Sequence, residues 1–142
     1  MSKKVYITRR ERFSAAHKMW NPAWDEQRNL EVFGQCANFN WHGHNYELFV
    51  TVTGTPDPST GYAIDLKVLS AIIKEKVIDL LDHKNLNMDV DFLRHQLIST
   101  ENVAIGIWEQ LEGAVKETGC VLYCVKLYET ENNFVEYFGG MQ

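Results

Sequence analysis

The chain has 142 residues, of which 45% are hydrophobic and 23% charged, and these proportions predict one globular domain over residues 1–142. Fourteen Lys and Arg against 19 Asp and Glu give a net charge of -5, so we expect no nucleic-acid partner, which would require a basic surface. No run approaches the ~20 apolar residues that cross a bilayer, and the first residues lack the apolar stretch of a secretory signal. We therefore expect a cytoplasmic protein with no membrane partner.

Two strands are expected in the first third of the chain, on either side of a long ordered segment. Side chains alternate over residues 5–14, and residues 46–53 place three aliphatic side chains on one face. Between these strands, residues 18–41 contain three of the four Trp and show no sustained period of 2 or 3.6. Loops of that length are usually either functional or disordered, and the aromatic content favours a functional role.

Two amphipathic helices follow a turn rich in Gly and Pro. In the first, apolar residues recur at steps of three and four from Leu66 to Leu80. The second has Ser99 and Thr100 as candidate N-caps, Glu101 in its first turn and Gly119 after its last turn.

The chain closes with two further strands, at residues 121–129 and 134–138, joined by a hairpin turn. The predicted order is therefore ββααββ, an α+β fold with a four-stranded antiparallel sheet and both helices on one face. So small a sheet leaves two edges and one face uncovered, and self-association would cover them.

The three cysteines are an odd number without regular spacing, which indicates reduced thiols rather than a disulfide framework. Cys120 and Cys124 lie in an apolar strand pattern and are expected in the core. Cys36 differs, because five residues separate it from the histidine pair described next.

The strongest local signal is His42-Gly43-His44, at the start of the second expected strand. Positions i and i+2 of an extended chain face the same side, so both imidazoles can reach one ion. His17, after the first strand pattern, can join them if the two strands are neighbours, and three imidazoles describe an open zinc site. An isolated His-x-His pair is by itself more often a pair of packed or surface histidines.

Other polar residues leave alternatives open. Cys36 could close a structural zinc site as a fourth ligand, or act nearby as a base or nucleophile. Asp82 could orient His83 for proton transfer, or the two could simply terminate a helix. Glu129 ends an apolar strand, where a carboxylate can accept N–H bonds from a ligand, although a solvated strand end is the commoner case.

Taken together, the motifs resemble those of the 6-pyruvoyl-tetrahydropterin synthase family over nearly the whole chain. The matching stretches are Phe13–His17, Phe33–Cys36, His42–Tyr46, Leu81–Leu86, Ser99–Val103 and Tyr128–Asn133. The resemblance implies the tunnelling fold of that family. It also implies a homohexamer of two stacked trimers, with active sites between subunits.

The resemblance assigns site residues as well. The implied zinc ligands are His17, His42 and His44. The implied catalytic residues are Cys36 as general base, with Asp82 and His83 as its proton relay. The implied substrate contacts are Glu129 for the pterin ring, with Thr100 and Glu101 as lesser contacts. The implied reaction converts 7,8-dihydroneopterin triphosphate to 6-pyruvoyl-tetrahydropterin with loss of triphosphate. Phe39 and Trp41 depart from the smaller or turn-forming residues of relatives, which predicts a different shape for the loop that carries Cys36.

Two alternative functions remain open. A 6-carboxytetrahydropterin synthase of queuosine biosynthesis shares the triad, the relay and the substrate, but typically has a C-x3-H-G-H spacing, whereas this chain has C-x5-H-G-H. A catalytically inert zinc-binding assembly protein, with Cys36 as a fourth ligand, would explain the histidines. It would leave Asp82, His83 and Glu129 without a role.

Overall fold

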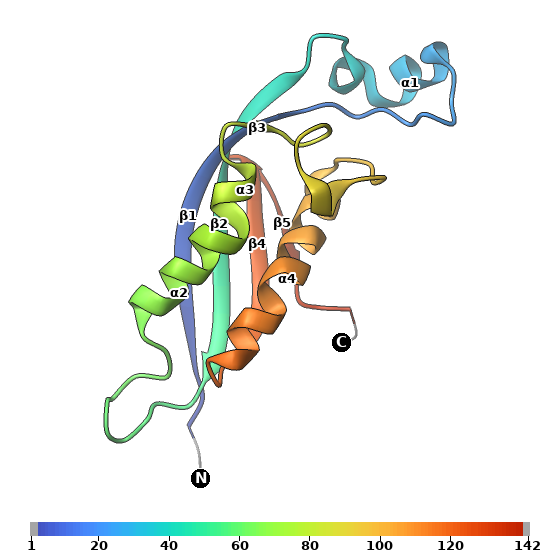
Figure 1. The fold of residues 1–142 in the computed structure, drawn as a ribbon. Helices are drawn as coiled ribbons and strands as arrows, with labels where there is room; N and C mark the ends of the chain where they lie inside the picture. Colours follow the sequence, from blue (N-terminus) through green and yellow to red (C-terminus); the bar gives the residue numbers. More distant parts are fainter. Residues whose placement is uncertain (1–2, 141–142) are drawn as a thin grey trace.

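A computed structural model describes residues 3–140, and it contains one five-stranded sheet with helices packed on one face (Figure 1). The strands are β1 (Val5–His17), β2 (His42–Gly54), β3 (Lys84–Asn85), β4 (Val121–Thr130) and β5 (Asn133–Tyr137). The α-helices are α1 (Glu26–Phe33), α2 (Leu66–Ile73), α3 (Asp79–Leu81) and α4 (Thr100–Glu117). The strands lie in the order β3-β1-β2-β4-β5, and all neighbours are antiparallel except β1 and β3.

The predicted α+β class is confirmed, whereas the four-stranded sheet and the order ββααββ are wrong. The fifth strand, β3, is two residues long and pairs parallel to β1. Flanking backbone bonds hold it there, because His83 N–H donates to the Ser14 carbonyl and Leu86 N–H donates to that of Ala16. A two-residue strand has no periodicity of its own, so the sequence pattern could not reveal it.

The segment between β1 and β2 contains α1, a helix that the sequence pattern does not predict. Asp25 caps its N-terminus by accepting a hydrogen bond from Arg28 N–H, and Asn29 is the buried residue of the helix. The Asn29 side chain accepts from Asn21 N–H and donates to the carbonyls of Asn21 and Asp25. Since polar bonds rather than an apolar stripe organise this helix, a search for hydrophobic periodicity misses it.

The two predicted amphipathic helices are confirmed on one face of the sheet. Helix α2 continues through a π-helical turn (Lys74–Ile78) into α3, and α4 lies beside them (Figure 1). Ser99 is the N-cap of α4 and accepts from Asn102 N–H at 3.1 Å, and the positive φ of Gly119 follows the helix end. Within residues 3–140 no helix combines the length and apolar character needed to cross a bilayer.

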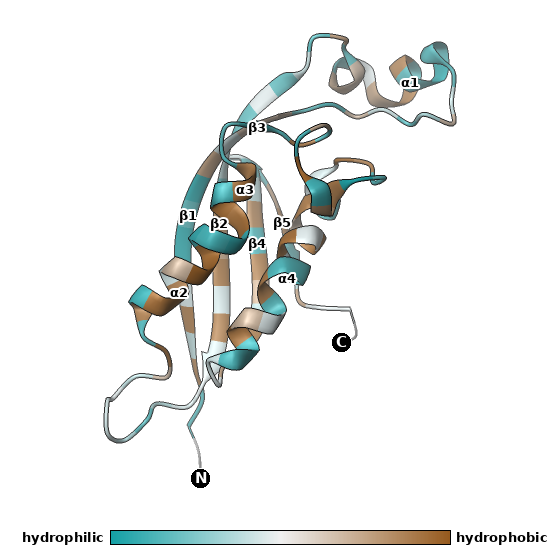
Figure 2. Cartoon of the chain, in the orientation of Figure 1, coloured by the Kyte–Doolittle hydropathy of each residue, from teal (hydrophilic) through white to brown (hydrophobic). Residues whose placement is uncertain are grey.

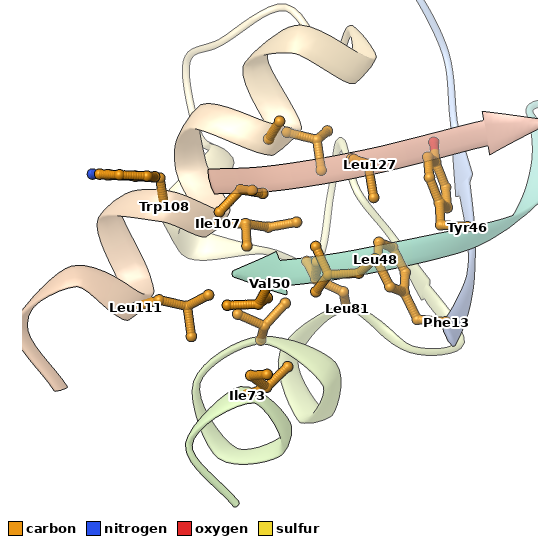
Figure 3. Packing of buried hydrophobic residues seen from close by; sticks show 14 of the residues in the cluster. Phe13, Tyr46, Leu48, Val50, Ile73, Leu81, Ile107, Trp108, Leu111 and Leu127 are labelled. Atoms are coloured by element: carbon orange, nitrogen blue, oxygen red, sulfur yellow. The ribbon is translucent and has the colours of Figure 1, made fainter. Parts of the chain in front are cut away.

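The core lies between these helices and the sheet, as the colouring by hydropathy in Figure 2 shows. On β2 the buried side chains occupy every second position, as predicted, from Tyr46 through Leu48 to Val52. They meet Ile73 of α2 and Ile107 of α4 (Figure 3). Burying one such aliphatic side chain contributes about 1.5–3 kcal/mol, so this layer defines the position of the strands.

The core also contains Cys120 and Cys124, both buried as predicted. Cys36 differs from them because it is exposed. On β2, the positions two and four residues before Tyr46 are His44 and His42, so the buried row of the sheet continues into the histidine pair.

Candidate active site

Pairing of β1 with β2 brings the three histidines together. His17 lies directly opposite His42, and Ala15 lies opposite His44. The ring centroids of His17 and His42 are 4.4 Å apart, and each of those rings is 5.0 Å from the His44 ring. One nitrogen from each residue lies within 4.8 Å of the other two, so the three imidazoles could hold a metal ion. The strand adjacency that the sequence prediction required is present.

The orientation of His17 leaves one ring nitrogen available to a ligand. Its Nδ1 is 2.8 Å from the Ile98 carbonyl, which can only accept, so Nδ1 carries the proton and Nε2 keeps its lone pair. Within residues 3–140, the Nε2 atoms of His17 and His44 are buried without a hydrogen-bond partner. Such atoms are costly unless another group satisfies them. Three imidazoles that converge in this way fit a zinc ion in an open site.

Burial keeps these rings in the form that binds a metal. Loss of hydration is the main cause that lowers the pKa of His17, His42 and His44 below the ordinary value. The neighbouring Glu129 carboxylate opposes this effect and raises the pKa of each ring, but to a smaller extent. The imidazoles are therefore neutral near pH 7, with lone pairs free for coordination.

A carboxylate lies next to the triad. Glu129 Oε1 is 3.6 Å from His44 Nε2, and Glu129 Oε2 accepts a hydrogen bond from the Thr100 hydroxyl at the start of α4. A pocket of about 300 Å³ opens here, and its lining includes all three predicted substrate contacts. The lining residues are Thr100, Glu101, Glu129, Asn133, Phe134 and Val135. The structure thus brings these three residues together beside the histidines, and their contact with a substrate stays a prediction.

Tyr46 is a member of this site that the sequence analysis did not single out. It is fully buried, its ring lies 5.7 Å from that of His44, and its hydroxyl has no hydrogen-bond partner among residues 3–140. Burial, with a smaller contribution from Glu129, raises the pKa of Tyr46, so the phenol stays neutral. The period of two along β2 could have found it, because Tyr46 follows His44 by two residues.

Asp82 and His83 lie at the β1 edge of the sheet and contact each other. Asp82 Oδ1 accepts from Ser14 N–H at 2.9 Å and is 3.1 Å from His83 Nδ1. The hydrogen bond from Ser14 is the largest cause of the lowered pKa of Asp82. Contacts with His83 lower this pKa further. His83 has a φ of 62° and an 83% exposed side chain. This φ lies in the left-handed region, which few residues other than Gly adopt.

The Asp82–His83 pair is not bonded to the three histidines within one chain, although His83 and His44 both line a pocket of about 530 Å³. Among residues 3–140, no hydrogen bond or ion pair joins Asp82 or His83 to the three histidines. Cys36, in a single 3₁₀ turn (Gly34–Ala37), is also outside the group of potential metal ligands in this part of the chain. The structure therefore gives no support to a closed zinc site with Cys36 as fourth ligand.

Comparisons with known proteins agree with this geometry. The sequence model of the family 6-pyruvoyl tetrahydropterin synthase matches residues 6–140. A 6-pyruvoyl tetrahydrobiopterin synthase of Pongo abelii is 47% identical over 136 residues, which cover 96% of this chain and 92% of that protein. The solved Caenorhabditis elegans 6-pyruvoyl tetrahydropterin synthase matches with a TM-score of 0.91 at 37% identity, covering 98% of each chain.

A relative with the alternative activity is more distant. The 6-carboxy-5,6,7,8-tetrahydropterin synthase of Bacillus subtilis (strain 168) is 28% identical over 112 residues, which cover 75% of this chain and 73% of that protein. The family match spans nearly the whole chain, and so do the similar synthases of animals. This chain belongs to the 6-pyruvoyl tetrahydropterin synthase family.

Proposed function

We propose that the protein is a zinc-dependent 6-pyruvoyl-tetrahydropterin synthase, which converts 7,8-dihydroneopterin triphosphate to 6-pyruvoyl-tetrahydropterin with loss of triphosphate. The observation that carries the proposal is the convergence of three neutral imidazoles next to the pocket that contains Glu129. The 47% identity to a 6-pyruvoyl tetrahydrobiopterin synthase supports the pyruvoyl product over the carboxy product.

The proposed roles follow from the chemistry of each side chain. The three histidines would hold the zinc ion, which would supply a Lewis acid for the hydroxyl groups of the substrate side chain. Glu129 accepts two parallel N–H bonds from the amino-pyrimidinone edge of the pterin, and the Thr100 hydroxyl orients its carboxylate. Cys36 removes and returns the carbon-bound protons as general base and acid.

The product assay tests this proposal directly. Purified protein with zinc is incubated with dihydroneopterin triphosphate, and the products are identified by mass spectrometry. A pterin that retains the full side chain as a pyruvoyl group is expected, together with inorganic triphosphate. A pterin shortened to a carboxyl group would assign the alternative synthase, and an unchanged substrate would favour the inert zinc-binding protein.

Glu129→Gln is expected to weaken the binding of a pterin such as biopterin while zinc content stays unchanged. The amide keeps the shape of the side chain but cannot accept two N–H bonds with a full negative charge. Loss of one partner of a buried charged pair costs on the order of 2 to 5 kcal/mol, or roughly 30- to 4,000-fold in Kd. Calorimetric titration measures this, with Glu136→Gln on β5 as the matched control, since Glu136 is exposed outside the pocket. An unaltered Kd would remove Glu129 from the site.

A homohexamer of two stacked trimers is the proposed assembly. Asp82 and His83 lie at the β3–β1 edge of the sheet, whereas the Glu129 pocket includes residues of β5 at the opposite edge. If copies associate edge to edge, the relay of one copy meets the pocket of the next, which explains their separation within one chain. Light scattering should therefore give about six times the 16.4 kDa chain mass, and a monomer at micromolar concentration would contradict the assembly.

A further inference from the structure

Lys18, the residue after His17, has its ammonium group among three aromatic rings. Lys18 Nζ is 4.8 Å from the ring centroid of Trp20, 5.1 Å from that of Trp41 and 5.6 Å from that of Phe39. We call these four residues the Lys18 cluster. Each ring is within the distance at which its face attracts a cation. Trp20 follows β1 and the other two rings precede β2, so the cluster joins both ends of the connecting segment.

The backbone of Lys18 is fixed to the body of the protein. Lys18 N–H donates to Asn87 Oδ1 at 3.0 Å, and Asn87 Nδ2 donates to the Lys18 carbonyl at 2.9 Å. The next residue, Met19, donates its N–H to the Cys36 carbonyl at 2.7 Å. The Cys36 carbonyl is therefore bonded to Met19, and the neighbouring residue Lys18 is fixed through its backbone to Asn87.

The rest of the segment folds on itself. Helix α1 runs directly into the 3₁₀ turn that contains Cys36, and Trp24 stacks on Phe33 with ring centroids 5.7 Å apart. Figure 1 shows this part projecting beyond the end of the sheet, away from α2 and α4. Its orientation relative to the three histidines is thus set at its base, where the Lys18 cluster lies.

The hydrophobic core does not hold the rings of the cluster on the β2 side. Phe39 is 85% exposed and Trp41 is 37% exposed, and neither ring belongs to the core cluster. The cation of Lys18 is the group that attracts both of them and Trp20 at once. A side chain of equal length without charge would lose this attraction.

We propose that Lys18 is a positioning residue that clamps the two ends of the segment between β1 and β2 and so sets where Cys36 lies relative to the zinc triad. The catalytic part of this inference rests on the proposed function, in which Cys36 is the base. The structural part, a clamp that needs a positive charge, does not depend on any activity.

The test compares Lys18→Met with Lys18→Arg, which keeps a cation that stacks on aromatic faces. In Lys18→Met, amide hydrogen exchange at Met19 is expected to accelerate by about tenfold, because loss of the cation–π attraction opens the base of the segment. Turnover should fall by a similar factor with KM changed less and zinc per chain unchanged, and Lys18→Arg should restore both rates.

Lys126→Met is the matched control. Lys126 Nζ also lies over three rings, those of Phe134 at 4.5 Å, Tyr128 at 5.4 Å and Phe49 at 5.9 Å, but on the strands β2, β4 and β5. Lys126→Met should leave the rate of amide hydrogen exchange at Met19 unchanged. Equal exchange in Lys18→Met and the unaltered protein, or equal acceleration in Lys126→Met, would overturn the clamp. Faster exchange that Lys18→Arg reverses, in a protein without synthase activity, would support the clamp and refute the proposed function.

Discussion

His17→Asn is expected to lower the affinity for zinc by at least ~100-fold, so that the purified protein no longer carries stoichiometric metal. The amide nitrogen of Asn can take the place of Nδ1 and still donate to the Ile98 carbonyl, while the position of Nε2 is lost. His17 is buried opposite His42 and close to His44, so its loss leaves two of the three imidazoles that could hold the ion. The change thus removes a ligand with little disturbance of the strand pairing.

Metal analysis per chain and competition with a chelator measure the effect. His95→Asn is the matched control, since His95 lies outside the triad and its φ of 64° is one that Asn tolerates. We expect this control to keep one zinc per chain. Full zinc occupancy in His17→Asn would show that the ion is held elsewhere.

Cys36→Ala is expected to lower turnover by about 10² to 10⁴, the usual effect of losing a general base, while zinc binding stays stoichiometric. The structure supports separate roles, because Cys36 is exposed on its own 3₁₀ turn and outside the group of three histidines. Three imidazoles suffice for the metal in an open site, so removal of the thiol leaves the ligand set complete.

Steady-state kinetics and metal analysis of the same samples separate these two outcomes. Cys124→Ala is the control, because it removes a thiol that is buried in the sheet. Iodoacetamide should modify exposed Cys36 faster than Cys120 or Cys124, and substrate should slow that reaction. A zinc-free Cys36→Ala protein, or a zinc–sulfur distance of ~2.3 Å by X-ray absorption, would make Cys36 a ligand and end its assignment as base.

Much of the architecture could be predicted from the sequence because its signals are local. The alternation of apolar residues along β2 follows from the two-residue period of a strand, and the same period places His42 and His44 on one face. Ser99 was recognisable as a cap because a hydroxyl before an amphipathic stretch satisfies the free N–H groups of a helix start. Helix α1 has a cap at Asp25 but no apolar stripe, since its buried residue is Asn29, and strand β3 has only two residues.

The sequence by itself determined which residue types were available for chemistry, and the tertiary structure decided which of them meet. His17 reaches His42 only because the register of β1 and β2 places them opposite each other. Glu129 meets Thr100 only because β4 and the start of α4 converge. Long-range register is set by burial of the whole β2 face against α2 and α4, which no short motif contains. The Lys18 cluster has the same origin, since folding brings Trp20 and Trp41 to one ammonium group.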